Sequence, residues 1–207
     1  MTPIGMPSSA EPSYVPAPHK DANRAAADVF LAHLLNDLKW LEVTPARKEF
    51  FMSDRPRSYA YKTYEGMREY HSSPYTAQVE GMRLAMNATP VILGGEAHRF
   101  NVCFLNRYDD QHNQLGWHAD DSPEMDHDHP ITVLSLGAER EIWWKPKDHK
   151  GEIPPQWRRK LEHGSFFTMP AGFQRTHLHR IPKCDRACGV RVSLTFRHYI
   201  DKETTDV

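Results

Sequence analysis

From Phe100 onward the chain consists of short runs of β-branched and aromatic residues separated by Gly, Pro, Asp and Asn. Runs of this kind, at roughly even spacing and without helical segments between them, are typical of antiparallel strands. The runs are "FNVCFLNRY", "LGWHAD", "ITVLSLG", "EIWWKP", "GSFFTMP", "HLHRIP" and "RVSLTFRHY". This half of the chain therefore predicts an antiparallel sandwich or jelly roll.

Two amphipathic helices are predicted before these strands, because apolar side chains recur there at helical spacing. In the first helix, which Asp21 or Asn23 would cap, they are Phe30, Leu34, Leu38 and Leu41. In the second, which is expected to begin near Pro74 and end near Asn87, they are Tyr75, Val79, Met82 and Met86. The segment between the helices, residues 54–73, has no clean period and is interpreted as a β-hairpin or mobile flap carrying Tyr59, Tyr61, Tyr64 and Tyr70.

The length of 207 residues is most simply that of one domain. Residues 1–23 are rich in Pro, Ser and Ala and are expected to form a flexible arm without the features of a signal peptide, which leaves residues 24–207 for the domain. No apolar run is long enough to span a membrane. Three cysteines are too few for a disulfide framework, so the expected location is the cytoplasm.

The formal net charge of −1 gives no general attraction to a polyanion, so nucleic-acid binding would depend on local patches. Two basic stretches offer such patches: "KPKDHKGEIPPQWRRK" and the basic, aromatic "RKEFFMSDRPRSYAYKTYEGMREY". The alternative for either is an ordinary solvated loop.

A metal site is suggested by "WHAD", because His118 and Asp120 lie two residues apart and leave the same face of a strand. His177 or His179 of "RTHLHRIP" would supply a third ligand, and two imidazoles with one carboxylate suit non-heme Fe(II). Two alternatives are an accidental surface pair and a zinc site, the latter made of His177, His179, Cys184 and Cys188.

The run "RVSLTFR" alternates apolar and polar residues, so one face of the predicted strand carries both Arg191 and Arg197. If that face lines the interior of a jelly roll, the two guanidinium groups imply a bound carboxylate, since a buried unpaired cation is costly. The alternative is an edge strand with both arginines in water.

These motifs together resemble the AlkB group of Fe(II)- and 2-oxoglutarate-dependent dioxygenases over about residues 27–200. The resemblance implies an α+β fold with a double-stranded β-helix (jelly roll) core, flanked by N-terminal helices and a substrate-binding flap. The "HRIPK" register makes the implied iron ligands His118, Asp120 and His179. The implied 2-oxoglutarate contacts are Asn106, Tyr108 and Arg191 at the distal carboxylate, Ser193 where the family often has Asn, and Arg197 near the carboxylate that chelates iron.

The activity implied by the resemblance is oxidative demethylation of N-alkylated nucleobases in DNA or RNA, of the DNA repair type. It uses Fe(II), 2-oxoglutarate and O2 and releases formaldehyde, succinate and CO2. The expected partner is a single-stranded nucleic acid with a methylated base, bound by a monomer. The predicted substrate contacts are Tyr59, Tyr61, Tyr64, Tyr70, Asp121, Arg158 and Arg159, with Arg55, Arg57 and Lys160 near phosphates.

One departure from the family pattern bears on the substrate. The position two after the aspartate ligand, often acidic in relatives that act on methylated bases, is Ser122, and Asp121 is the candidate to replace that carboxylate. Two alternative functions therefore stay open. One is a 2-oxoglutarate-dependent hydroxylase of a protein or small molecule, and the other is a non-catalytic nucleic-acid-binding module.

Overall fold

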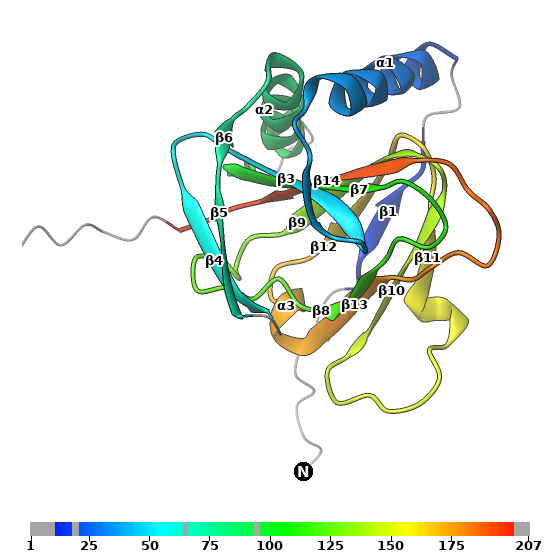
Figure 1. Ribbon diagram of the computed structural model, residues 1–207. Coiled ribbons are helices and arrows are strands. Elements are labelled where there is room, and N and C mark those ends of the chain that lie inside the picture. Colours follow the sequence, from blue (N-terminus) through cyan, green and yellow to red (C-terminus); the bar gives the residue numbers. More distant parts are fainter. Residues whose placement is uncertain (1–10, 18–20, 64–65, 93–95, 201–207) are drawn as a thin grey trace, which may run out of the picture.

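Two antiparallel sheets pack face to face in the computed structural model, which describes residues 11–17, 21–63, 66–92 and 96–200 (Figure 1). The larger sheet has the strand order β1-β12-β9-β14-β7-β3-β2, with β6 parallel to β3, and the smaller has the order β11-β10-β13-β8. The larger sheet comprises β1 (Ser13–Val15), β2 (Leu41–Thr44), β3 (Arg47–Ser53), β6 (Ser73–Pro74), β7 (Val102–Tyr108), β9 (Ile131–Gly137), β12 (Ser165–Met169) and β14 (Arg191–Arg197). The smaller comprises β8 (Leu115–His118), β10 (Arg140–Pro146), β11 (Arg158–Leu161) and β13 (His177–Ile181). The predicted jelly-roll core is confirmed.

Apolar side chains pack on both faces of the larger sheet. Between the sheets, Trp144 of β10 and Phe167 of β12 lie with ring centroids 5.6 Å apart. The opposite face is covered by the helices α1 (Asp21–Asp37) and α2 (Ala77–Ile92), which lie together at the top of Figure 1. Because β14 lies in the middle of this sheet, its apolar residues face the helices and its polar residues face the interior of the jelly roll.

The first helix follows its predicted apolar stripe only as far as Asp37. Phe30 and Leu34 are buried against the larger sheet, as expected. Leu41, which was predicted to continue the stripe, instead begins β2 and is 48% exposed. Its helical spacing was coincidental, because β2 pairs with β3 and this pairing draws the chain into an extended conformation.

The second helix begins and ends later than expected. The Thr76 hydroxyl accepts the backbone N–H of Val79 at 3.4 Å, so the cap lies two residues after Pro74. The helix runs on past Asn87 to Ile92. The Asn87 side chain bonds both the N–H and the carbonyl of Phe100, at 2.9 and 3.2 Å, so this residue ties the helix to the following chain rather than ending it.

Part of the segment expected to be a flexible arm is ordered. Ser13–Val15 forms β1 and pairs antiparallel with Phe166–Thr168 of β12, and α1 already begins at Asp21. An edge strand presents unpaired backbone groups, and β1 covers those of β12. The sequence offered no sign of this pairing because its partner lies about 150 residues further along the chain.

The predicted flap is a two-stranded hairpin of β4 (Ser58–Thr63) and β5 (Gly66–His71), which forms a small sheet of its own on the left of Figure 1. Tyr59 lies opposite Tyr70 in the register, and the side chain of Tyr70 is buried. Tyr64 and the side chains of Tyr59 and Tyr61 lie outside the described residues. Among the described helices none is long and apolar enough to cross a membrane.

Candidate active site

The smaller sheet brings together the three predicted iron ligands. β8 and β13 pair so that His118 lies directly opposite His179, and Asp120 follows β8 by two residues. The ring centroids of the two histidines are 4.1 Å apart. The Asp120 carboxylate lies 3.8 Å from His118 Nε2 and 3.9 Å from His179 Nε2, and all three ligand atoms lie within 4.8 Å of one another. Among the described residues this is the one group with ligand geometry for a metal ion.

Neighbouring groups orient the triad. His118 Nδ1 is 2.9 Å from the Gly116 carbonyl, and a proton donated there leaves Nε2 as the free lone pair. Arg197 Nη2 donates to Asp120 Oδ1 at 2.8 Å, and the Asp120 N–H donates to the side chain of Gln174 at 3.0 Å. Asp120 Oδ2 is buried and has no hydrogen-bond partner among the described residues. A buried carboxylate oxygen facing two imidazoles fits a cation such as Fe(II).

The electrostatics favour the protonation states that a metal requires. Burial, reinforced by the nearby His118, lowers the pKa of His179 to about 3, so this imidazole is neutral. Burial opposes ionisation of Asp120, but Arg197 and the two histidines outweigh it and hold the pKa of the carboxyl below its usual range. Metal ligands bind as neutral imidazoles and as carboxylates, so the triad needs no proton release at neutral pH.

An unpaired guanidinium lies deeper in the jelly roll. Arg191 is fully buried, and its Nε donates to Ser135 Oγ at 2.9 Å. Nη1 and Nη2 have no hydrogen-bond partner among the described residues. Burial lowers the pKa of Arg191 to about 10, so the group is still a cation at neutral pH. Two parallel, unsatisfied N–H donors in a dry site match the geometry of a carboxylate.

The other predicted cosubstrate residues surround Arg191 and line the way to the metal site. The ring of Tyr108 lies 5.2 Å from the Arg191 guanidinium and directly opposite it in the β14–β7 register. In the same register Asn106 is opposite the buried Ser193. Asn106 and Arg197 both line the pocket that holds His118, whereas Arg191, Tyr108 and Ser193 are not among the residues that line it.

The active-site pocket, about 490 Å³ in volume, also contains residues that the sequence analysis missed. Arg47 on β3 forms an ion pair with Glu49 and donates to Asn106 Oδ1 at 2.7 Å, and Glu49 accepts a hydrogen bond from Tyr70. Phe104 of β7 forms part of the wall, stacked on Phe51 with centroids 4.2 Å apart. The alternation of "RKEFFMS" placed Arg47, Glu49 and Phe51 on one strand face and was the available signal.

Two of the predicted substrate residues lie at this pocket. Tyr70 contributes to its wall, although the ring is only 4% exposed. Asp121 lines its mouth and pairs with Lys147 at 3.3 Å. Met67, 70% exposed on the hairpin, also lines the pocket. The hairpin therefore contributes both a tyrosine and an exposed apolar side chain to the entrance.

The basic group "WRRK" is divided by the fold. Arg158 stacks on Trp143 on the outer face of the smaller sheet, whereas Arg159 stacks on Tyr14 of β1, with distances of 4.4 and 5.4 Å to the ring centroids. Lys160 forms an ion pair with Glu139. Successive side chains of a strand leave opposite faces, so Arg158 and Arg159 lie on different sides of β11, and their contact with the substrate stays a prediction.

The alternative zinc site is not assembled among the described residues. The ring of His177 stacks on Phe173 at 4.4 Å, and its Nδ1 lies 2.8 Å from Thr176 Oγ1. Cys184 and Cys188 are free and half-buried. No group of metal ligands combines either cysteine with a histidine in the described part of the chain, and His179 belongs to the triad instead.

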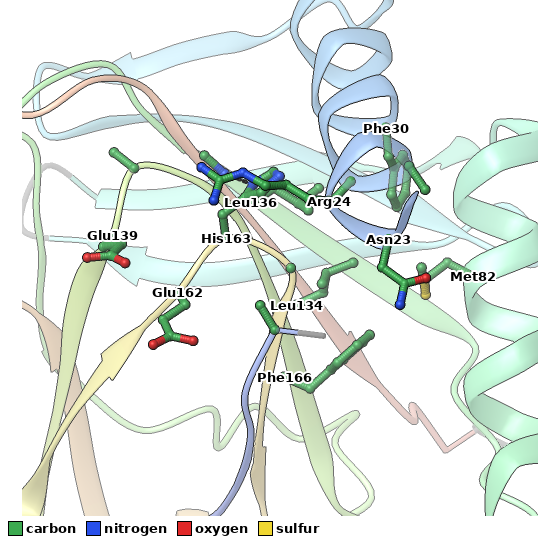
Figure 2. A pocket seen from close by; sticks show the side chains of 16 residues that line it. Asn23, Arg24, Phe30, Met82, Leu134, Leu136, Glu139, Glu162, His163 and Phe166 are labelled. Carbon is green, nitrogen blue, oxygen red and sulfur yellow. Dashed lines mark hydrogen bonds between the residues drawn. The ribbon is translucent and has the colours of Figure 1, made fainter. Parts of the chain in front are cut away.

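A second cavity, about 660 Å³ in volume, lies on the other side of the larger sheet, beneath α1 (Figure 2). Figure 2 shows the apolar Phe30, Leu134 and Phe166 and the polar Glu162 and His163 among the side chains that line it. The Gly137 N–H donates to His163 Nδ1 at 2.7 Å. This cavity contains none of the predicted site residues.

Comparison with known proteins agrees with this site. The family model described as the 2OG-Fe(II) oxygenase superfamily matches residues 19–197. Human alpha-ketoglutarate-dependent dioxygenase alkB homolog 3 is 30% identical over 183 residues, which cover 83% of this chain and 61% of the relative. DNA oxidative demethylase ALKBH2 of Arabidopsis thaliana is 30% identical over 162 residues, covering 69% of this chain and 46% of the relative. The chain thus matches about half to three fifths of the length of these relatives.

A solved structure described as "The structure of OsALKBH1" matches the fold, with a TM-score of 0.61 and 14% identity over 90% of this chain and 96% of that one. The fold and the triad define a protein of the iron- and 2-oxoglutarate-binding jelly-roll class. The chain belongs to the 2OG-Fe(II) oxygenase superfamily and, within it, to the AlkB family.

Proposed function

We propose that this protein is an Fe(II)- and 2-oxoglutarate-dependent dioxygenase that demethylates N-alkylated nucleobases. The observation that carries the proposal is a set of two buried groups that each need a partner: the Arg191 guanidinium needs an anion, and the Asp120 carboxylate oxygen needs a cation. A dicarboxylate that also binds a metal would meet both needs. The names of the relatives support the nucleic-acid substrate.

Arg191 and its neighbours would bind 2-oxoglutarate. Arg191 has two donors in one plane for the distal carboxylate, and the neighbouring Tyr108 hydroxyl would add a third. Asn106 accepts from Arg47 through Oδ1, which leaves its Nδ2 hydrogens free to donate. Arg197, already bonded to Asp120, would neutralise the carboxylate nearer the metal.

His118, Asp120 and His179 would hold Fe(II) on one side and leave the other side open. Bound Fe(II) would supply the oxygen chemistry, in which 2-oxoglutarate and O2 yield succinate, CO2 and one oxygen atom for the substrate carbon. A hydroxylated N-methyl group then breaks its C–N bond, giving formaldehyde and the N–H base. The protein positions the substrate and excludes water, and the stacked pair of Phe51 and Phe104 supplies a dry wall.

The substrate base would enter between the β4–β5 hairpin and the metal site. Met67 and Tyr70 line this entrance, and aromatic side chains stack on any nucleobase with about 1–3 kcal/mol per base. A single strand is the preferred substrate, because a base then enters without the cost of unpairing a duplex. We further propose that the protein acts as a monomer in the cytoplasm and that Asp121 contacts the base.

The test is a panel of methylated DNA and RNA oligonucleotides, single- and double-stranded, incubated with Fe(II), 2-oxoglutarate and ascorbate. Formaldehyde and demethylated base, in equal amounts and dependent on 2-oxoglutarate, are expected from at least one single-stranded member. Succinate without formaldehyde from any member would identify a hydroxylase of a protein or small molecule. Neither product, with oligonucleotide binding retained, would identify a non-catalytic binding module.

A further inference from the structure

The strands that hold the metal triad carry a row of cations and indoles on their other face. Trp117 precedes His118 on β8, and Arg180 follows His179 on β13, so these side chains leave the sheet on the side away from the metal site. Trp143 of β10 lies opposite both Arg180 and Arg158 in the register. The row therefore crosses all four strands of the smaller sheet, whose labels β8, β13, β10 and β11 lie in the lower and right part of Figure 1.

Stacking holds the cations of this row in place. The Arg180 guanidinium lies 4.3 Å from the ring centroid of Trp143 and 5.1 Å from that of Trp117. Arg158 lies 4.4 Å from the Trp143 centroid, and it reaches the ring from the strand on the other side. Lys145 Nζ lies 5.1 Å from the Trp117 centroid. Alternating cations and indoles thus form one continuous stack.

The stack leaves hydrogen-bond donors available. A guanidinium that stacks by its face keeps its N–H donors in its own plane, pointing away from the ring. Arg158 uses one Nη2 hydrogen on the Ile153 carbonyl, and the Nε atoms of Arg158 and Arg180 are buried without a hydrogen-bond partner among the described residues, so a ligand would be bound by the remaining terminal N–H groups. Two arginines, Arg158 and Arg180, already lie over the Trp143 ring, so its role is to hold the cations rather than to stack on a base.

Positive charge in this row is not neutralised by the protein. Lys145, Arg158 and Arg180 form no ion pair within the described part of the chain. They line a shallow pocket of about 460 Å³ together with both indoles, and Glu152 is the one carboxylate at its edge. Cations that are immobilised, close together and unpaired are suited to an anionic ligand with several oxygen acceptors, such as a phosphate.

We propose that this outer face binds the phosphodiester backbone of a nucleic-acid strand through Arg158, Arg180 and Lys145. The inference rests on the proposed function, since the strand would be the substrate beyond the base held in the active site. Pre-stacked guanidiniums lose little side-chain entropy on binding, so each phosphate contact is formed at low cost. The site gives affinity and register but no base specificity.

The experiment measures anisotropy of a fluorescent, unmethylated single-stranded 20-mer at several salt concentrations. The variant carries Arg158→Gln and Arg180→Gln. The control carries Arg24→Gln and Lys39→Gln, which remove equal charge from exposed positions on and just after α1, on the far side of the larger sheet. We expect the first variant to bind at least about tenfold more weakly and to show a salt slope smaller by about 0.7 for each phosphate contact removed. The control is expected to bind like the parent.

Demethylation provides a second readout. The double variant should raise KM for a methylated 20-mer much more than KM for a methylated trinucleotide, because a trinucleotide has few phosphates beyond the base held in the active site. If the double variant lowers the melting temperature, the single variants Arg158→Gln and Arg180→Gln replace it, and each is expected to show about half of the change in slope.

The outcomes separate the two proposals. A parent protein that binds the 20-mer, with a double variant of equal affinity and salt slope, overturns the outer-face site and leaves the proposed function standing. A parent protein that binds no oligonucleotide in a salt-dependent way but converts 2-oxoglutarate to succinate overturns the nucleic-acid assignment, and the outer-face site with it.

Discussion

Replacing Arg191 by Met should separate cosubstrate binding from folding. Met has similar length and no charge, so it fills much of the same volume. Arg191 would hold 2-oxoglutarate through a bidentate, charge-assisted pair in a buried site, and removing such a pair typically costs about 2–5 kcal/mol, or roughly 30- to 4,000-fold in affinity. In the ligand-free protein the substitution removes one hydrogen bond to Ser135 but also a buried cation with two unpaired nitrogens. We therefore expect the melting temperature of the ligand-free variant to equal or exceed that of the parent.

Arg140 offers a matched control, because it is equally buried and its guanidinium also lies over the Tyr108 ring, 5.4 Å from the ring centroid. Its terminal nitrogens, however, donate to the backbone carbonyls of Asp110, Asn113 and Pro182 at 3.2, 2.7 and 2.6 Å. Arg140→Met leaves these acceptors without a donor, at a cost of about 1–3 kcal/mol for each that stays buried. A destabilisation of about 3 kcal/mol would lower the melting temperature by roughly 6–12 °C in a chain of this size.

The assay is thermal unfolding of the Mn(II)-loaded protein with and without 2-oxoglutarate. A ligand at 100 times its Kd stabilises by about 2.7 kcal/mol, so the parent and Arg140→Met should both show an upward shift. Arg191→Met, with a roughly 30- to 4,000-fold weaker affinity, should show at most about a third of this shift at the same concentration. The reasoning would be refuted by an Arg191→Met protein that is strongly destabilised without ligand, or by one that retains the full shift with 2-oxoglutarate.

Three further predictions concern the identity of an iron ligand, the loss of stability in acid and the backbone conformation at Gly137. His179→Ala should abolish iron binding, measured by metal analysis after anaerobic purification, whereas His177→Ala should retain it; the reverse pattern would exchange their roles. Burial lowers the pKa of His129 to about 4, below an unfolded value of about 6.5, so protonation of the unfolded chain should reduce stability as the pH falls from about 6.5 to about 4. In urea titrations at pH 7.5 and 4.5, His129→Gln should show a smaller pH dependence than the parent, and an unchanged dependence would contradict this origin. Gly137→Ala should lower the free energy of unfolding by about 1–3 kcal/mol because its φ is +88°, and by more because an added Cβ would collide with a backbone oxygen. Gly151 also has a positive φ but lies in open space, so Gly151→Ala should cost less in the same urea titration.

Several elements of the site could be predicted from the sequence because they depend on local periodicity. Residues separated by an even number of positions along a strand lie on the same face. His118 and Asp120 were therefore expected together, and so were Arg191 and Arg197. The helical stripe around Phe30 and Leu34 was identified for the same reason. Short runs between turn residues likewise predicted the antiparallel sheets.

Pairings between distant segments were not available from such patterns. His177 and His179 share a strand face, so periodicity alone did not show which of them binds the metal. The resemblance to the family selected His179. Its position opposite His118 in the β13–β8 pairing agrees with that choice. The same limit hid the ordered strand β1 and the link from Arg47 to Asn106, which joins residues 59 positions apart.

The sequence by itself determined which chemical groups the protein possesses and which of them share a strand face, because alternation is a property of the local backbone. The tertiary structure decided which faces turn inward. It buried Arg191 with two terminal nitrogens that have no hydrogen-bond partner among the described residues, placed Arg158 and Arg159 on different aromatic rings, and set the indole–guanidinium stack back to back with the metal site. Those outcomes follow from which strands pair and how the two sheets close on each other, and both depend on contacts between residues far apart in the chain.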